Sequence, residues 1–319
     1  MTAALRLSAV SVDLAQSGGL VPFLGRPRRL AILHDVSLTV QAGTTLALVG
    51  ESGSGKTTLA RAVAGLQPIS AGSIETSSSA GGAAVRGSDL SLMFQDATAS
   101  LSPRMRIGDL VTEPFVIARQ PMTDRAGKAA ELLAGVGLPA DFAHRYPHEL
   151  SGGQARRVCV ARALALTPAL VIADEPTAGL DVSVQAEILN LMTDIQRRLG
   201  LAYLIITHNL ALVRHVAGRI AVLYLGRIVE EGPTARVFAD PAHPYTASLI
   251  AAEPLPDPRR RRHDLAIKGE IPSILRRPSG CEFHTRCPRA EALCRTTAPL
   301  LRAIAPDRLA RCHFAMTET

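Results

Sequence analysis

Aromatic side chains are scarce in this chain of 319 residues. It has no tryptophan, and aromatic residues make up only 3% of it. The core therefore has to pack mainly leucine, valine, isoleucine and alanine, and hydrophobic residues at 47% of the chain can supply that core. Few side chains remain on which a nucleobase could stack. Charged residues of both signs, at 20%, favour a folded globular protein over a disordered one.

Long uninterrupted apolar runs are also missing. A membrane-spanning helix needs about 20 consecutive apolar residues. The richest segment, from Val158 to Ala173, is interrupted by Arg162 and Pro168. The segment from Met1 to Ala15 alternates like a strand and has no long apolar run, so we do not expect a signal peptide. We predict a cytosolic protein that does not itself cross a membrane.

Acidic residues are fewer than basic ones, and the formal net charge is +7. One run, from Arg259 to Arg262, supplies four of the positive charges. No aromatic residue interleaves with this run, so we interpret it as a solvated linker rather than a patch for nucleic acid or anionic lipid. We therefore expect no nucleic-acid partner.

Segments of strand length and segments with helical periodicity alternate along most of the chain. This is the pattern of an α/β core, with a parallel sheet covered on both faces. Prolines become frequent from Pro233 onward, so we predict a core in residues 1–250 and a C-terminal extension in residues 251–319. The segment from Ser70 to Ser88 is predicted to be a flexible surface excursion. The predicted strands are Leu5 to Leu14, Ala31 to Val40, Thr44 to Gly50, Ala169 to Ala173, Ala202 to Thr207 and Ile220 to Leu225, and the predicted helices are Thr57 to Gly65, Arg125 to Ala134, Gly152 to Leu166 and Val184 to Leu199.

A glycine-rich loop follows the third predicted strand and opens the first predicted helix. In such a loop the backbone N–H groups cradle phosphate oxygens at the helix N-terminus. Lys56 is expected to reach the β- and γ-phosphates of a nucleotide, and the Thr57 hydroxyl to ligate Mg²⁺. The residues that match the pattern G-x-x-x-x-G-K-[ST] are Gly50, Glu51, Ser52, Gly53, Ser54, Gly55, Lys56 and Thr57, and Thr58 follows them.

Two carboxylates stand at the end of the predicted strand that begins at Ala169. Asp174 and Glu175 follow an apolar run, where acidic side chains are costly unless a cation is near. We expect Asp174 to hold Mg²⁺ and its hydration shell, and Glu175 to accept a proton from the attacking water. Paired acids alone are more often a solvated strand end, but their position after a phosphate loop favours catalysis of ATP hydrolysis.

Cysteines crowd the last part of the chain. Cys281, Cys287, Cys294 and Cys312 lie within it, and Cys159 lies far from them in a helical pattern. In a reducing compartment such a group suggests a metal more than disulfides. Four thiols suit a four-cysteine iron–sulfur cluster or a structural Zn²⁺, although free thiols are the simpler alternative.

The sequence from Leu150 to Gln154, Leu-Ser-Gly-Gly-Gln, resembles the signature of ATP-binding-cassette proteins. Taken alone it is also a good helix start. The resemblance implies a P-loop NTPase cassette with a helical signature subdomain, in which the signature of one subunit closes over the phosphate loop of another. It also implies that Ser151, Gly152, Gly153 and Gln154 contact the γ-phosphate of a partner's nucleotide, so that hydrolysis requires a dimer.

Other residues follow in the order that this family uses. By resemblance, Gln95 joins Mg²⁺ and the attacking water to a transmembrane partner, Asp181 crosses the dimer interface, and His208 contacts the γ-phosphate. His208 could otherwise be an ordinary residue before a helix. One departure is Leu14, which stands where the family usually places an aromatic side chain that stacks on adenine.

The chain is most similar to the ATPase subunits of oligopeptide and dipeptide importers, of the second-subunit type. The resemblance implies ATP-driven import of short peptides, a paralogous ATPase partner, two permease subunits, indirectly a substrate-binding protein, and a place at the cytoplasmic face of the inner membrane. It favours a [4Fe–4S] cluster on the four C-terminal cysteines, with Zn²⁺ as the alternative. Import of nickel or another small solute, or a soluble cassette ATPase acting on nucleic acid, are the competing functions. The motifs that carry the resemblance are Phe94 to Arg104, Arg145 to His148, His243 to Thr246, Gly269 to Pro272, Gly280 to Phe283, Arg286 to Pro288 and Cys312-His313.

Overall fold

The chain divides into two structural units, each with strands and helices. The computed structural model describes residues 2–16, 28–77, 89–97, 99–253 and 269–316. The first unit comprises Met1–Arg6, Thr39–Thr45 and Glu75–Ile206, and the second comprises Leu7–Leu38, Leu46–Ile74 and Thr207–Thr319. The arginine run from Arg259 to Arg262 lies outside the described residues.

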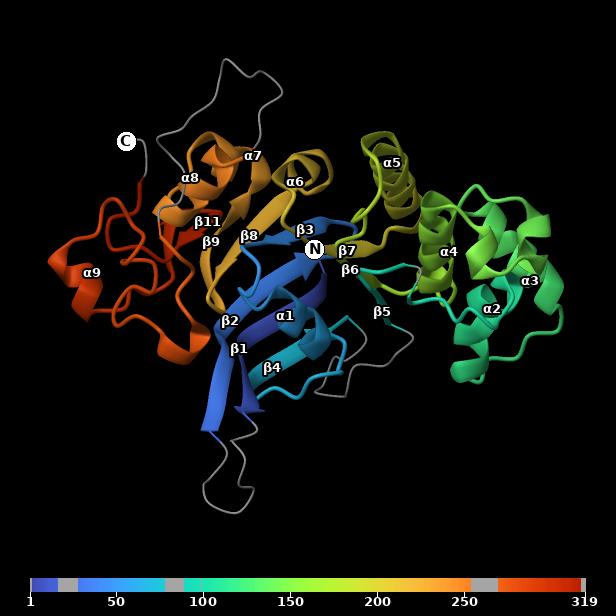
Figure 1. Ribbon diagram of the computed structural model, residues 1–319, viewed down its shortest axis with the longest axis horizontal. Helices are drawn as coiled ribbons and strands as arrows, with labels where there is room; N and C mark the ends of the chain where they lie inside the picture. The colour runs from blue at the N-terminus through green and yellow to red at the C-terminus, as the bar shows by residue number, and fades with distance from the viewer. Residues whose placement is uncertain (1, 17–27, 78–88, 98, 254–268, 317–319) are drawn as a thin grey trace. The chain divides into compact units, whose positions relative to one another are not determined.

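The first unit combines parallel strands with a group of helices. Strand β6 (Leu170–Asp174) pairs in parallel with β5 (Leu90–Met93) on one side and with β7 (Ala202–Thr207) on the other. Every residue of β6 and β7 is buried, as the apolar runs predict for strands covered on both faces. The helices α2, α3 and α4 lie side by side in Figure 1. The helices of this unit are α2 (Ile107–Ile117), α3 (Arg125–Ala134), α4 (Gly152–Leu164) and α5 (Val182–Leu199), with short 3₁₀ turns η1 (Ala140–His144) and η2 (Pro147–Glu149).

The second unit contains the phosphate loop and the C-terminal part of the chain. Its strands follow the order β10-β11-β9-β8-β3, of which β3 and β8 are parallel and the other neighbours antiparallel. A further sheet has the order β2-β1-β4. Strands β1 to β4 each have their larger part in this unit and the rest in the first. The strands are β1 (Ala3–Gln16), β2 (Arg28–Gln41), β3 (Thr45–Val49), β4 (Ala71–Thr76), β8 (Arg219–Tyr224), β9 (Arg227–Pro233), β10 (Arg302–Ala305) and β11 (Arg308–Ala310). The helices are α1 (Lys56–Val63), α6 (Leu210–Val216), α7 (Thr234–Ala239), α8 (Pro244–Ala251) and α9 (Ala292–Thr296), with the 3₁₀ turn η5 (Ile274–Arg276).

The C-terminal segment extends the sheet of the second unit. In β11, Leu309 and Ala310 pair with Glu231 and Glu230 of β9. Arg308 bonds to Glu230 at 3.0 Å, and the two side chains are only 3% and 0% exposed. A buried charge without a partner would be costly, so this ion pair fixes where the segment docks.

The predicted α/β class is confirmed, and one local prediction is wrong. Residues 71–76 form β4, where a flexible excursion was expected, while residues 78–88 of that excursion lie outside the described residues. β4 is the last strand in its sheet order, and most of its residues are exposed, so it lacks the alternation by which half-buried strands are recognised. No helix in the part of the chain that the structure describes is long and apolar enough to span a bilayer.

Candidate active site

The phosphate loop connects β3 to α1 and has the backbone that its glycines predict. Gly55, the N-cap of α1, has a φ of 105°, a left-handed conformation that glycine adopts at little cost. A Cβ on Gly50 would collide with the backbone oxygen of Leu223. No side chain caps the first turn of α1, and the N-terminus of a helix favours the binding of an anion. The loop is thus built to receive an anion.

Lys56 lies over the loop that precedes it. Its Nζ donates to the backbone oxygens of Gly50 at 2.7 Å and Glu51 at 3.0 Å. Thr57 is exposed, and Thr58 is half-buried. The ammonium group is therefore held at the mouth of the loop, where it could exchange these carbonyl oxygens for phosphate oxygens.

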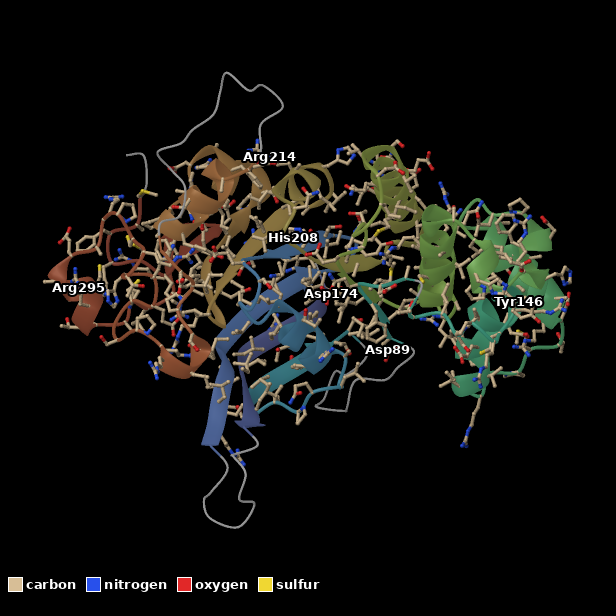
Figure 2. All side chains as sticks on the ribbon, in the orientation of Figure 1. Asp89, Tyr146, Asp174, His208, Arg214 and Arg295 are labelled. Carbon is tan, nitrogen blue, oxygen red and sulfur yellow. The ribbon has the colours of Figure 1, made fainter. Side chains whose placement is uncertain are left out.

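The two carboxylates predicted for catalysis differ in their surroundings. Asp174, labelled in Figure 2, is the last residue of β6 and only 7% exposed. Glu175 is half-buried and has a φ of 50°, which is uncommon for a residue with a side chain. Its backbone N–H donates to the Ile206 oxygen at 2.8 Å, which helps to hold this conformation. Backbone strain of this kind, about 1–3 kcal/mol, is often kept where a side chain must be aimed.

The predicted signature residues begin helix α4. The Ser151 hydroxyl accepts a hydrogen bond from the Gln154 N–H, and the Gln154 side chain accepts one from the Ser151 N–H, which forms a capping box. Ser151 and Gly152 are exposed, while Gly153 and Gln154 are half-buried. Their hydroxyl and amide groups therefore lie at an accessible helix N-terminus.

The remaining predicted site residues follow strands or open helices. Asp181 is the N-cap of α5, and hydrogen bonds from the Val184 N–H and the Ser183 hydroxyl lower its pKa. Gln95 is exposed two residues after β5. His208, labelled in Figure 2, is exposed directly after β7. The phosphate loop and His208 belong to the second unit, while the other residues of the predicted ATP site belong to the first.

The four C-terminal cysteines come together. Cys281, Cys287, Cys294 and Cys312 line one small cavity of about 10 Å³ and are all free thiols. Burial raises the pKa of Cys281 to about 11 and also raises the pKa of Cys287 and Cys312. Among the described residues, no group of three or more His, Cys, Asp or Glu side chains qualifies as a site for a metal ion, so the predicted iron–sulfur cluster stays a proposal.

Comparison with known proteins assigns the family. The family described as "ABC transporter" matches residues 33–178, and the family "Oligopeptide/dipeptide transporter, C-terminal region" matches residues 229–294. A putative peptide import ATP-binding protein of Brucella abortus (strain 2308) is 46% identical over 294 residues, which cover 89% of this chain and 87% of that protein. The chain belongs to the ABC transporter family.

Further similarities agree with this assignment. The di/tripeptide transport ATP-binding protein DppF of Pseudomonas aeruginosa (strain UCBPP-PA14) is 43% identical over 294 residues, 89% of this chain and 90% of that one. The solved dimer of an ATP-binding cassette in a post-hydrolysis state with ADP and phosphate matches with a TM-score of 0.62 and 25% identity, over 72% of this chain and 98% of that one. The predicted ABC ATPase fold and the resemblance to peptide importers are confirmed.

Sequence reasoning missed one buried arginine of this ABC cassette. Arg156 of α4 is 2% exposed and donates to the backbone oxygens of Gln95 at 2.9 Å, Phe94 at 3.3 Å and Ala178 at 3.4 Å. It therefore ties the signature helix to the Gln95 segment. Its place two residues after Gln154 was the only signal in the sequence.

Proposed function

We propose that this ABC ATPase hydrolyses ATP to power the import of di- and oligopeptides through partner permeases at the cytoplasmic face of the inner membrane. The observation that carries the proposal is the pairing, in one chain, of a cassette with the C-terminal region of oligopeptide/dipeptide transporters. Relatives over 89% of the chain are named as peptide import or di/tripeptide transport proteins. These names favour peptides over nickel as the cargo.

The residues of the candidate site have complementary chemical roles. The phosphate loop from Gly50 to Thr58 binds the phosphates of ATP, and Lys56 neutralises charge on the β- and γ-phosphates. Glu175 accepts a proton from the attacking water, and His208 donates a hydrogen bond to the γ-phosphate. Thr57, Gln95 and Asp174 would hold Mg²⁺, which when bound supplies further charge neutralisation on the phosphates.

Hydrolysis requires a second cassette. Ser151 to Gln154 and Asp181 act across the interface on the nucleotide of a paralogous ATPase subunit, so the active unit is a heterodimer. Closure of the two cassettes around ATP moves the attached permeases, and hydrolysis resets them. A substrate-binding protein delivers the peptide to the permeases from the other side of the membrane.

A cleft in the first unit, lined by both polar and apolar side chains, suits a permease helix. The cleft has a volume of about 700 Å³. Phe94 and Ile117, which line it, are 47% and 75% exposed, an unusual exposure for large apolar side chains. Gln95 follows Phe94 directly, so a helix docked here would sense the state of the ATP site. Its lining includes Phe94, Glu113, Pro114, Ile117, Arg162 and Leu166.

The four C-terminal cysteines hold one [4Fe–4S] cluster with a structural role. Support comes from the meeting of all four cysteines at one cavity, because ligation of a metal cluster requires the thiols to be brought together. Anaerobic purification followed by iron and acid-labile sulfide analysis tests this. One equivalent of zinc would change the metal, and a protein with neither metal would refute the site.

Reconstitution tests the whole proposal. The chain, a paralogous cassette, two permeases and a binding protein are placed in proteoliposomes, and ATP-dependent uptake of labelled dipeptides is measured. We expect uptake that is lost with Glu175→Gln, and phosphate release that is low for the isolated chain and high for the complex. Uptake of nickel in place of peptides would overturn the cargo assignment, and a rate of hydrolysis unchanged by the partners would overturn the dimer.

A further inference from the structure

Glu51, the second residue of the phosphate loop, is held by the C-terminal part of the chain. Its carboxylate accepts two hydrogen bonds from Arg286, one at 2.7 Å from Nη1 and one at 2.9 Å from Nη2. Its backbone N–H donates to the Tyr245 Oη at 2.8 Å. All these residues lie in the second unit. A bidentate bond of this kind fixes orientation as well as charge.

The two partners of Glu51 are packed rigidly. The Arg286 side chain is 4% exposed, and Tyr245 is fully buried. The Tyr245 ring lies against Tyr224 and Phe283, with centroids 4.6 Å and 5.4 Å away. Three of the chain's few aromatic side chains therefore pack together in the core at this point. Close-packed side chains transmit a displacement rather than absorb it.

Glu51 also contacts the lysine of the loop. Its backbone oxygen accepts the 3.0 Å hydrogen bond from the Lys56 Nζ. Glu51 therefore connects two parts of the molecule. Its N–H and carboxylate bond to Tyr245 and Arg286, and its carbonyl group bonds to Lys56. Loss of the Arg286 bonds would leave a half-buried carboxylate unpaired and free the loop to relax.

We propose that Arg286 and Tyr245 are positioning residues of the ATP site, which fix Glu51 and through it the phosphate loop in the conformation that receives ATP. The inference rests on the proposed role of this loop in ATP binding. Neither residue contacts the nucleotide; both act through Glu51. The segment around Arg286 thus supports the conformation of the nucleotide site. Because coupling between two sites is reciprocal, ATP binding in turn stabilises this segment.

Calorimetric titration of the full chain with ATP tests the proposal. Arg286→Met and Tyr245→Phe should each raise the Kd by about tenfold, within the usual range of coupling between sites. Arg286→Lys keeps the charge but loses the fork and should give an intermediate Kd. Combining Arg286→Met with Glu51→Gln should be no worse than the more harmful single variant, because both remove the same interaction.

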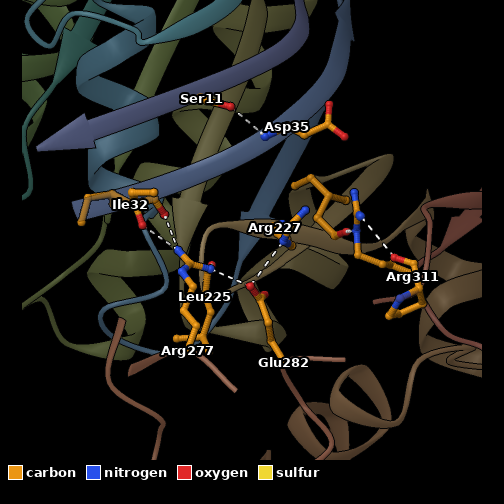
Figure 3. Close-up of polar contacts among 11 residues, drawn as sticks. Ser11, Ile32, Asp35, Leu225, Arg227, Arg277, Glu282 and Arg311 are labelled. Carbon is orange, nitrogen blue, oxygen red and sulfur yellow. Dashed lines mark hydrogen bonds and ion pairs between the residues drawn. The ribbon is translucent and has the colours of Figure 1, made fainter. Parts of the chain in front are cut away.

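Two matched controls separate positioning from general damage. Arg277 lies in the same segment and donates to Glu282 of that segment at 2.7 Å and to the Ala31 oxygen of β2 at 2.8 Å (Figure 3). Its hydrogen bonds go to Leu225, Glu282, Ala31 and Ile32, and none of these residues belongs to the phosphate loop. Tyr203 has a buried hydroxyl without a hydrogen-bond partner among the described residues. Arg277→Met should lower the Tm yet leave the Kd for ATP unchanged, and Tyr203→Phe should leave the Kd unchanged.

Hydrogen exchange gives a readout that does not depend on activity. Saturating ATP should slow amide exchange in residues 280–296 of the parent, and this protection should be lost in Arg286→Met. A normal Kd in folded Arg286→Met and Tyr245→Phe, or ATP protection unchanged by Arg286→Met, would overturn the proposal. If Lys56→Ala raises the Kd and these variants do not, only the positioning role fails; if Lys56→Ala also binds ATP normally, the assignment of the loop itself fails.

Discussion

Two helices of this cassette begin at sequences predicted to bind phosphate, and they differ in how their N-termini are capped. Helix α1 follows Gly55, and no side chain caps it. Helix α4 follows Ser151, which closes a capping box with Gln154. The start of α1 therefore has no side-chain cap, while the side chains of Ser151 and Gln154 cap the start of α4.

The difference indicates when each helix meets the nucleotide. Helix α1 can bind phosphate in a single subunit. In the proposed dimer, helix α4 exchanges the bond from the Gln154 N–H to the Ser151 hydroxyl for contacts with the γ-phosphate of the partner's nucleotide. A cap of this kind stabilises a helix by about 0.5–2 kcal/mol. We expect that cost to keep α4 from closing over a site that lacks the γ-phosphate.

The largest expected effect is on turnover, at Glu175, the proposed general base. Glu175→Gln should lower phosphate release in the assembled complex by at least about 10²-fold, because an amide cannot accept the proton of the attacking water. ATP should still bind, so the N-terminal amides of α4 should become protected from exchange only in the complex. Glu187→Gln, the same change at a side chain 62% exposed on α5, is the control. Equal phosphate release by Glu175→Gln and the parent would contradict the assignment.

A change at the uncapped N-terminus of α1 should weaken ATP binding. Lys56→Ala should raise the Kd of the isolated chain for ATP by about 10²-fold, since charged hydrogen bonds worth about 3 kcal/mol are lost. Titration calorimetry measures this. Lys128→Ala, which removes a pair with Glu131 and a cation–π contact with Phe115, should bind ATP like the parent. An unchanged Kd would show that phosphate binds elsewhere.

A change at the capped N-terminus of α4 should affect turnover and leave ATP binding intact. Ser151→Ala should leave the ATP affinity of the isolated chain unchanged and lower turnover of the complex by about tenfold, the loss of one hydrogen bond to a charged group. The removed cap also destabilises the fold by about 1 kcal/mol. Asp124→Ala removes a comparable cap from α3, where Asp124 accepts from the Gly127 N–H at 2.8 Å, and controls for that loss. If both variants slow turnover equally, Ser151 acts only as a cap.

Features with a local cause could be predicted from the sequence. The predicted helix from Arg125 to Ala134 matches α3, and the strand from Ala202 to Thr207 matches β7. Both are set by the spacing of apolar residues and by signals at their own ends. The phosphate loop was found for the same reason, because strand, glycines and helix follow one another directly.

Features that depend on distant partners could not be predicted. Arg286 bonds to Glu51, 235 positions away in the sequence, and no local pattern near either residue predicts this contact. Helix α2 contains Pro114, a residue that normally argues against a helix interior. The docking of β11 on β9 likewise depends on the buried pair of Arg308 and Glu230, which periodicity does not reveal.

The smallest expected effect concerns recognition of the nucleotide base. Leu14 is 36% exposed on β1. The sequence resemblance implies an aromatic ring at this position for stacking on adenine. Leucine offers no π-face, so the parent should prefer ATP over GTP by less than about threefold in competition binding. Leu14→Tyr should tighten ATP binding by about fivefold, since stacking contributes about 1 kcal/mol. Leu66→Tyr, at a position 61% exposed, should not. A strong ATP preference in the parent would mean that another side chain holds the base, and Leu14→Tyr would then leave the affinity as it was.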